Sequence, residues 1–73
     1  HNVKIGSNTL ITACVEISGS VSIGKNVWIS PNSTIIDHVT IGDDCKIGIG
    51  SVVTKNVCSN KSVFGNPARV LRI

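Results

Sequence analysis

Two histidines and three cysteines are the side chains of this 73-residue sequence best suited to act as a base, a nucleophile or a soft metal ligand. Histidine exchanges a proton near neutral pH, which makes His1 and His38 the candidate general bases. The cysteines, Cys14, Cys45 and Cys58, are odd in number and include no Cys-x-x-Cys pair, which argues against a zinc site or a disulfide framework. We therefore expect free thiols, as in a cytoplasmic protein, and no metal.

A covalent intermediate on cysteine does not fit the spacing of these residues. Cys14 has no histidine in register with it and no neighbour that would favour its thiolate. The expected chemistry is therefore direct attack on a bound substrate, with a histidine as the base that takes a proton from the attacking group.

Charge is distributed unevenly along the chain. Residues 1–44 carry two lysines against four carboxylates, a net charge of −2, whereas residues 45–73 carry five basic residues and no acidic one, a net charge of +5. A basic end suits the phosphates of a ligand such as coenzyme A, or an acidic carrier protein. Nucleic acid is a poorer fit, because the basic end has neither an aromatic stacking platform nor a recognition helix.

The elements that must position these side chains repeat every six residues. A branched aliphatic stands at every sixth position from Ile5 to Val53, nine times in succession. A small or β-branched residue usually stands two positions earlier, and the residue between the two is mostly polar. Residues two apart point to the same face of an extended chain, so each hexad predicts one short strand. The second position of the hexad is often Asn, which tolerates a corner with positive φ.

A period of six is a signature of the parallel β-helix, in which stacked coils build a continuous apolar column. Three faces per coil predict three coils of 18 residues, at 1–18, 19–36 and 37–54. A β-sandwich, the main competing fold, has no fixed six-residue phase. The sequence therefore predicts an all-β chain whose β-helix covers residues 1–54.

The ends of the predicted β-helix differ from its middle. The period fails after residue 54, because Ser59 and Gly65 stand where aliphatics are expected, so residues 55–73 are predicted to form an irregular C-terminal cap. The sequence contains no Met and starts in phase with the hexads, and we expect the β-helix to be truncated at its N-terminus.

Several segments resemble the left-handed β-helix acyltransferases with hexapeptide repeats, over essentially the whole chain. They are the first hexad HNVKIG, the later Ile-Gly hexads, and the ending SVVTKNV…VFGNPARVLR. Residues 1–41 are most similar to the UDP-3-O-acylglucosamine N-acyltransferases of lipid A synthesis, the pathway of lipopolysaccharide. The ending is more typical of acetyltransferases that use acetyl-CoA. The resemblance implies a left-handed coil, where general topology would favour the right hand, and a homotrimer with donor sites between adjacent β-helices.

The resemblance also implies a catalytic pair, with His1 as the general base. Gly19 follows His1 by one coil, so its N–H should lie about 4.8 Å along the axis, where it would stabilise the oxyanion of a thioester. His38 follows His1 by two coils and one residue and would flank the same groove, in contact with the donor or the oxyanion. Corner geometry alone explains Gly19 and His38 equally well. Asp37 precedes His38 and could orient its imidazole, but adjacent residues on a strand point apart.

The resemblance places the acyl donor near the C-terminal end of the β-helix. The donor-binding residues it implies are Gly48, Gly50, Ser51, Lys55 and Arg69. A solubilising charged cap is the alternative explanation of the basic residues. Trp28 stands at an outward position and is expected to contact either a ligand or a neighbouring subunit.

The predicted function is transfer of an acetyl or longer acyl group from a CoA or acyl-carrier thioester to an amino group of a nucleotide-linked amino sugar. No permanently bound cofactor is expected. The alternative is a non-catalytic trimeric β-helix that serves as an interaction or assembly module. A γ-type carbonic anhydrase is excluded because that enzyme needs three histidines for zinc, and this chain has two.

Overall fold

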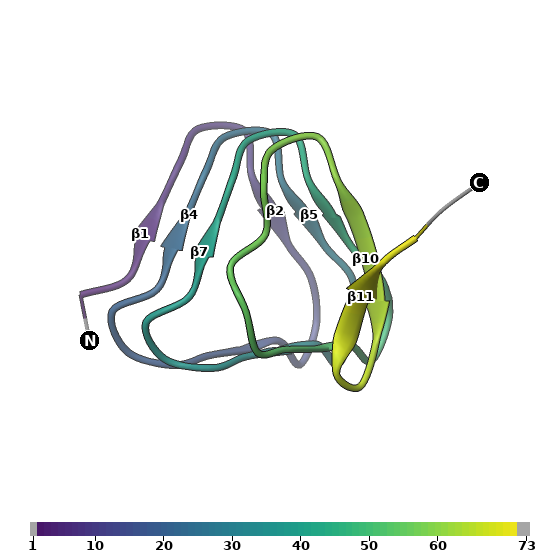
Figure 1. Cartoon of the computed structure of the whole chain (residues 1–73). Coiled ribbons are helices and arrows are strands. Elements are labelled where there is room, and N and C mark those ends of the chain that lie inside the picture. Colours follow the sequence, from purple (N-terminus) through teal and green to yellow (C-terminus); the bar gives the residue numbers. More distant parts are fainter. Residues whose placement is uncertain (1, 72–73) are drawn as a thin grey trace.

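The computed structural model describes residues 2–71 and consists of short strands joined by corners (Figure 1). The strands are β1 (Lys4–Ile5), β2 (Leu10–Ile11), β3 (Glu16–Ile17), β4 (Ser22–Ile23), β5 (Trp28–Ile29), β6 (Thr34–Ile35), β7 (Thr40–Ile41), β8 (Lys46–Ile47), β9 (Val52–Val53), β10 (Ser62–Gly65) and β11 (Ala68–Val70). Each of β1 to β9 comprises the fourth and fifth positions of one hexad. The predicted all-β fold is confirmed.

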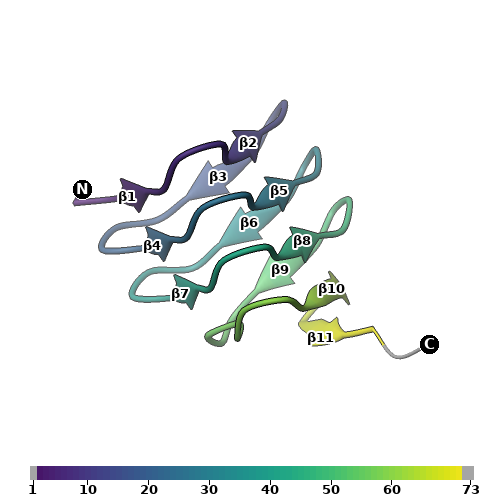
Figure 2. The same ribbon diagram turned by 90° about the horizontal axis from the view of Figure 1, so that it is seen from above.

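The strands form the three faces of a prism. Face A is the sheet β1-β4-β7, face B is the sheet β2-β5-β8-β10-β11, and face C is the sheet β3-β6-β9. Pairing is parallel with a register of 18 residues, so that Ile5 lies beside Ile23 and Ile23 beside Ile41. Figure 2 shows the successive coils as tiers, with β1, β4 and β7 in one row. The predicted 18-residue coil is confirmed.

The core is the predicted column of aliphatics. Ile29, Ile35 and Ile47 are completely buried, whereas the outward neighbour Trp28 is 52% exposed. Ile5 is 48% exposed because it belongs to the first coil of the stack, which has a neighbouring coil on one side only. The inner side chains therefore stabilise one coil against the next, and no face has a core of its own.

The corners have one backbone conformation throughout the regular coils. From Asn2 to Gly50, the second residue of each hexad has a φ between 56° and 67°. Asn, Gly and Asp tolerate this left-handed region best, which explains the frequent Asn at this position. His38 is one of the residues held in this conformation, with a φ of 63°.

The repeat continues past residue 54 in a shifted frame. Val57 lies beside Ile41, and Val63 beside Ile47, so the register falls from 18 residues to 16. The side chain of Asn56 compensates for the shortened corner, because its Oδ1 accepts a hydrogen bond of 2.9 Å from the Thr40 N–H. The aliphatics missing at residues 59 and 65 are therefore supplied two residues earlier.

The chain leaves the prism through a hairpin. Strand β10 stacks in parallel on β8. Strand β11 then folds back beside β10 (Figure 1), antiparallel and with Phe64 paired to Arg69. Residues 55–71 thus add part of a further coil and one reversed strand. The division of the chain at residue 54 stays a prediction.

Candidate functional site

Sequence prediction places the catalytic residues on the edge between faces C and A, which we call corner CA. Gly19, Asp37 and Lys55 each follow by two residues a core aliphatic of face C, and those aliphatics are in register. The three residues therefore form a column along this corner, one per coil. His1, the predicted base, lies outside the described residues.

Gly19 and His38 are joined through the backbone. The His38 N–H donates a hydrogen bond of 3.0 Å to the Gly19 carbonyl. Within residues 2–71 no acceptor is bonded to the Gly19 N–H. Because glycine has no side chain to shield it, this N–H is free to bind a negatively charged oxygen.

His38 and Asp37 have exposed side chains at this corner. Their relative exposures are 70% and 68%, and His38 Nδ1 lies 3.9 Å from Asp37 Oδ2. The expectation that adjacent residues point apart does not apply here, because His38 turns the corner with a positive φ and is not in a strand. Sequence reasoning gave this carboxylate–imidazole pair little weight for that reason.

At the edge between faces A and B, which we call corner AB, the equivalent backbone N–H groups have hydrogen-bond partners. Lys25 has the hexad position of Gly19, and its N–H donates a hydrogen bond of 2.9 Å to Asp43 Oδ1 in the next coil. The Asp43 N–H in turn donates to Ser59 Oγ at 3.0 Å. At corner AB the N–H groups of Lys25 and Asp43 are thus bonded to side chains of the following coil, whereas the N–H of Gly19 at corner CA has no acceptor within residues 2–71.

The predicted donor residues of the glycine loop lie at a third edge, corner BC, between faces B and C. Gly48, Gly50 and Ser51 connect β8 of face B to β9 of face C. Within one chain they are on a different edge of the prism from Gly19 and His38. Within one chain the structure therefore places predicted donor residue Lys55 at the corner of Gly19 and His38, but leaves the glycine loop on another edge.

Glycine at positions 48 and 50 of corner BC is explained by two different structural features. The Gly48 N–H donates to the Val63 carbonyl at 2.8 Å, and a Cβ at Gly48 would lie 2.6 Å from Phe64 Cδ1. Gly50 has a φ of 67°, and a Cβ there would meet no atom within 4 Å. Packing thus disfavours a side chain at position 48 unless Phe64 shifts, whereas position 50 requires only a residue that tolerates positive φ.

Ser51 is fully buried, and its polar groups have partners within the chain. Its hydroxyl accepts a hydrogen bond from the Gly65 N–H at 3.2 Å, and its carbonyl accepts one from the Thr34 N–H at 2.8 Å. A contribution of Ser51 to donor binding stays a prediction and would have to be indirect. The exposed residue of this turn is Ile49, at 59% exposure, which sequence reasoning missed.

The predicted basic residues line a hollow of about 270 Å³ at the C-terminal end of the prism. Lys55 and Arg69 contribute to its wall, together with Lys61, whose place there the sequence did not reveal. The rest of the lining is Val53, Asn56, Val57, Cys58, Val63, Ala68 and Val70. Three cations around an apolar floor suit an anionic group attached to an apolar body.

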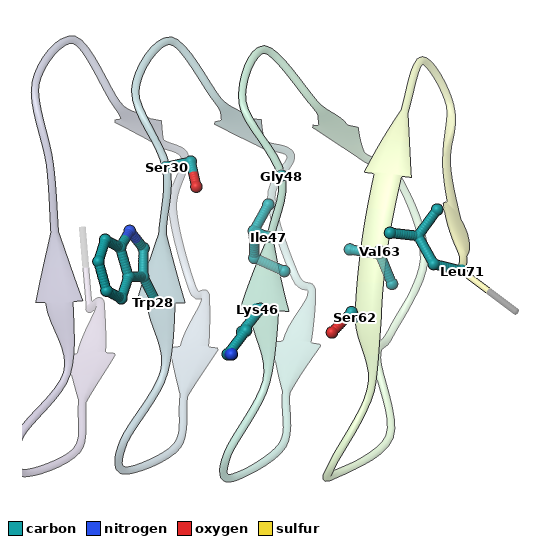
Figure 3. Close-up of a pocket in the computed structure, with 8 residues that line it drawn as sticks. All are labelled: Trp28, Ser30, Lys46, Ile47, Gly48, Ser62, Val63 and Leu71. Atoms are coloured by element: carbon teal, nitrogen blue, oxygen red, sulfur yellow. The ribbon is translucent and has the colours of Figure 1, made fainter. Parts of the chain in front are cut away.

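A second hollow, of about 370 Å³, lies on the outer surface of face B (Figure 3). Trp28 on β5 and Leu71 after β10 and β11 stand at its two ends, with Lys46 and Ser62 between them. Trp28 and Leu71 are 52% and 54% exposed. The lining of this hollow is therefore largely apolar with one cation, Lys46, as expected for a contact with a ligand or another subunit.

The described part of the chain has neither a cluster of metal ligands nor a membrane-spanning helix. Among residues 2–71, no three His, Cys, Asp or Glu side chains are grouped as they would be around a metal ion. The cysteines are free thiols; Cys14 and Cys58 are exposed and Cys45 is buried. The described residues contain no helix that could cross a membrane.

The repeat also identifies the family. A family model described as "Bacterial transferase hexapeptide (six repeats)" matches residues 20–55. The chain belongs to the hexapeptide-repeat family. The fold is accordingly the predicted left-handed parallel β-helix.

Known members of the family match most of this chain. The UDP-3-O-acylglucosamine N-acyltransferase of Bordetella pertussis is 46% identical over 57 residues, which are 78% of this chain and 16% of that protein. LpxA from Acinetobacter baumannii has a TM-score of 0.95 and 30% identity, over 97% of this chain and 28% of its own. PerB from Caulobacter crescentus, in complex with CoA and GDP-perosamine, has a TM-score of 0.91 and 26% identity, over 99% and 35%. The chain spans between 16% and 35% of the length of these proteins.

Proposed function

We propose that this chain is the β-helix of an acyltransferase that acts on a nucleotide-linked amino sugar, of the kind used for lipid A or surface polysaccharide. The acyl group, acetyl or longer, comes from a thioester of CoA or of acyl carrier protein. The names of two relatives support this class, since one is a UDP-3-O-acylglucosamine N-acyltransferase and the other was solved with CoA and GDP-perosamine. The observation on this chain that carries the proposal is the Gly19 N–H, which has no acceptor within residues 2–71, beside exposed His38.

The proposed reaction is direct transfer. The amino nitrogen of the sugar attacks the thioester carbonyl carbon, and the imidazole of His1 takes a proton from that amino group. The carbonyl oxygen becomes an oxyanion, which the Gly19 N–H stabilises. The carbon–sulfur bond then breaks, and the departing thiolate receives the proton from His1. His38 flanks this corner and contacts the donor or supports the oxyanion.

The donor is held at its other end by the C-terminal part of the chain. Lys55 and Arg69 pair with the phosphates of CoA or of phosphopantetheine, in the basic hollow that they line. Gly50 allows the donor to approach the backbone closely, because a Cβ there would face open space. Gly48 and Ser51 support the site through packing and the hydrogen bond to Gly65. The thioester is a substrate, so we expect no permanently bound cofactor.

A homotrimer explains why the predicted site residues are divided between two edges of one prism. Gly19 and His38 lie at corner CA, whereas the glycine loop lies at corner BC. If corner CA of one subunit faces corner BC of the next, each cleft receives both sets. The exposed Trp28 on face B supplies apolar surface for such an assembly. We place the trimer in the cytoplasm, where the three free thiols stay reduced.

A non-catalytic assembly module is the second candidate, and the exposed apolar row on face B favours it. Leu10, Trp28, Phe64 and Leu71 are each between 50% and 54% exposed. Such a surface stabilises association without any chemistry. The two candidates differ in the role of His38, which matters to an enzyme and not to an assembly module.

The test is a thiol-release assay on the longest natural chain that contains this sequence. Acetyl-CoA and a long-chain acyl thioester of acyl carrier protein are offered in turn with a panel of nucleotide-linked amino sugars. Exposed Cys14 and Cys58 react with the thiol reagent as well, but they give a fixed background that does not grow with time. We expect donor thiol release that depends on the acceptor and is lost in His1→Ala.

The matched variants separate catalysis from folding. His38→Asn keeps a residue that tolerates the positive φ, as Asn26 and Asn32 do at the same hexad position. We expect it to retain the trimer and to lose activity by about tenfold or more, the low end for a catalytic contact. Full activity in both His1→Ala and His38→Asn would refute the proposed mechanism. A trimer without turnover on any acceptor would favour the assembly module.

A further inference from the structure

We propose that Asp37 controls whether the Gly19 N–H is available to the donor thioester. The carboxylate has two alternative partners: the N–H of Gly19, one coil earlier, and the imidazole of His38. When it accepts from Gly19 the proposed oxyanion site is closed, and when it turns to His38 the site is open. The catalytic consequence rests on the proposed function, whereas the hydrogen bond itself does not.

Register places the carboxylate where this control requires it. Ile17 of β3 pairs with Ile35 of β6, and Gly19 and Asp37 each follow these residues by two positions. Asp37 is therefore the residue directly beyond Gly19 along the axis, separated by one inter-strand spacing of about 4.8 Å. A side chain of the length of Asp spans such a gap to a backbone N–H.

Corner AB shows that an aspartate at this hexad position makes that bond. Asp43 lies one coil beyond Lys25, in the same relation as Asp37 to Gly19. Its Oδ1 accepts the Lys25 N–H at 2.9 Å. The same two hexad positions, with the same acceptor, therefore form the closed arrangement within this molecule.

Corner CA is in the open arrangement. Asp37 Oδ2 lies 3.9 Å from His38 Nδ1, and within residues 2–71 the Gly19 N–H has no acceptor. Asp37 is 68% exposed, so its carboxylate rotates without disturbing the packing. Asp43 is less free, because its own N–H is bonded to Ser59 Oγ and it is partly buried. Two corners with the same acceptor thus differ in how firmly the carboxylate is held.

The chemistry makes the two arrangements unequal. A carboxylate bonded to the Gly19 N–H occupies the donor that an oxyanion needs, and its charge repels the oxyanion. The rate constant then falls with the fraction of molecules in the open arrangement, since only these bind the thioester productively. Asp37 is a positioning residue in this scheme, because it acts through Gly19 and does not touch the reacting atoms.

The first experiment measures the hydrogen bond without any substrate. Amide hydrogen exchange of Gly19 is compared in the natural chain and in the Asp37→Asn and Asp37→Ala variants, with the Lys25 amide as internal reference. Alanine is compatible with this hexad position, since Ala13 occupies it at corner BC. We expect Gly19 exchange to accelerate about twofold in Asp37→Ala, as for a bond formed about half of the time. The isosteric Asn should keep part of the protection.

Equal Gly19 exchange in the natural chain and Asp37→Ala would overturn the proposal, because no bond would then be lost.

The second experiment measures turnover. We expect kcat/KM of Asp37→Ala to rise about twofold, because the fraction of molecules in the open arrangement doubles. A fall in kcat/KM would also overturn the proposal, since Asp37 would then assist His38. If no variant turns over, the proposed function fails, and the exchange result still decides whether Asp37 binds Gly19.

Discussion

Corners AB and CA of this prism are built from the same hexad positions but differ in how closely successive coils approach. At corner AB the sixth residue of each hexad is glycine, at Gly6, Gly24 and Gly42. A Cβ at Gly24 would lie 2.8 Å from the Asp43 N, and one at Gly6 would lie 2.6 Å from the Gly24 carbonyl carbon. At corner CA the sixth position holds Ser18 and then Ile36. Corner AB is therefore the tight edge and corner CA the open one.

Side-chain hydrogen bonds reinforce this difference. Thr9 Oγ1 donates to the Gly24 carbonyl at 2.7 Å and accepts from the Val27 N–H at 3.2 Å. The bond from Lys25 to Asp43 adds a further link between coils at the same corner. A repeat can thus use one edge to fix the stacking of its coils and leave another edge free for ligands. Four substitutions test this division, and the largest effect is expected where the coils are closest.

Gly24→Ala should give the largest loss of stability. The added Cβ meets backbone atoms of the next coil that cannot move alone. Adding a methyl group to a filled site typically costs about 1–3 kcal/mol. Ser30→Ala is the control, because Ser30 has the same hexad position at corner BC, and we expect it to be nearly neutral. The midpoint of urea unfolding is the measurement, and equal midpoints for the two variants would contradict the tight corner.

Thr9→Val should be the next most destabilising. Valine keeps the shape and removes the hydroxyl, which leaves the N–H of buried Val27 without its side-chain acceptor. An unsatisfied buried group costs about 1–2 kcal/mol. Thr40→Val on the exposed side of face A is the control, since the Thr40 hydroxyl has no hydrogen-bond partner among residues 2–71. A stability loss of the same size in both variants would show that the effect comes from strand preference instead.

The sequence predicted the regular coils because their cause is local. Alternation at the third and fifth positions determines which side chains face inward, and the left-handed corner explains the Asn at the second position. The shortened corner near Asn56 was not predictable in this way. Its register of 16 depends on one side chain replacing a backbone acceptor of Thr40, and residues 16 apart in sequence make that bond. Periodicity alone reads such a shift as the end of the repeat.

The candidate site was predicted in part, for the same reason. The hexad phase places Gly19 and His38 at one corner, which the structure shows. It does not reveal which N–H groups are bonded, since Lys25 and Gly19 have equivalent positions and differ only in how the next aspartate is held. The sequence also did not show that Ser51 is buried with its hydroxyl bonded to the Gly65 N–H. Those contacts depend on the hairpin of β10 and β11.

Asp43→Ala should weaken corner AB by a smaller amount. It removes the acceptor of the Lys25 N–H, a bond near the surface where water replaces the lost partner. We expect a loss of about 0.5–1 kcal/mol, at the low end for a hydrogen bond. The matched variant is Asp37→Ala, which should change stability by less than about 0.5 kcal/mol because its carboxylate is exposed. A greater loss in Asp37→Ala would mean that corner CA is not the open edge.

Gly50→Asn tests the division between stacking and binding with the smallest expected change in stability. A Cβ at this position faces open space, and the φ of 67° matches the 63° at which Asn32 sits one coil earlier. The free energy of unfolding, measured from the urea midpoint, should therefore change by less than about 0.5 kcal/mol. The larger side chain nevertheless occupies the space through which the proposed donor approaches, so we expect KM for the donor to rise while kcat is retained. Gly48→Ala is the contrasting variant. Its added Cβ collides with Phe64, so we expect it to lower the stability of the chain, unlike Gly50→Asn. An unchanged donor KM in Gly50→Asn would place the donor away from corner BC and leave that edge, like corner AB, with a purely structural role.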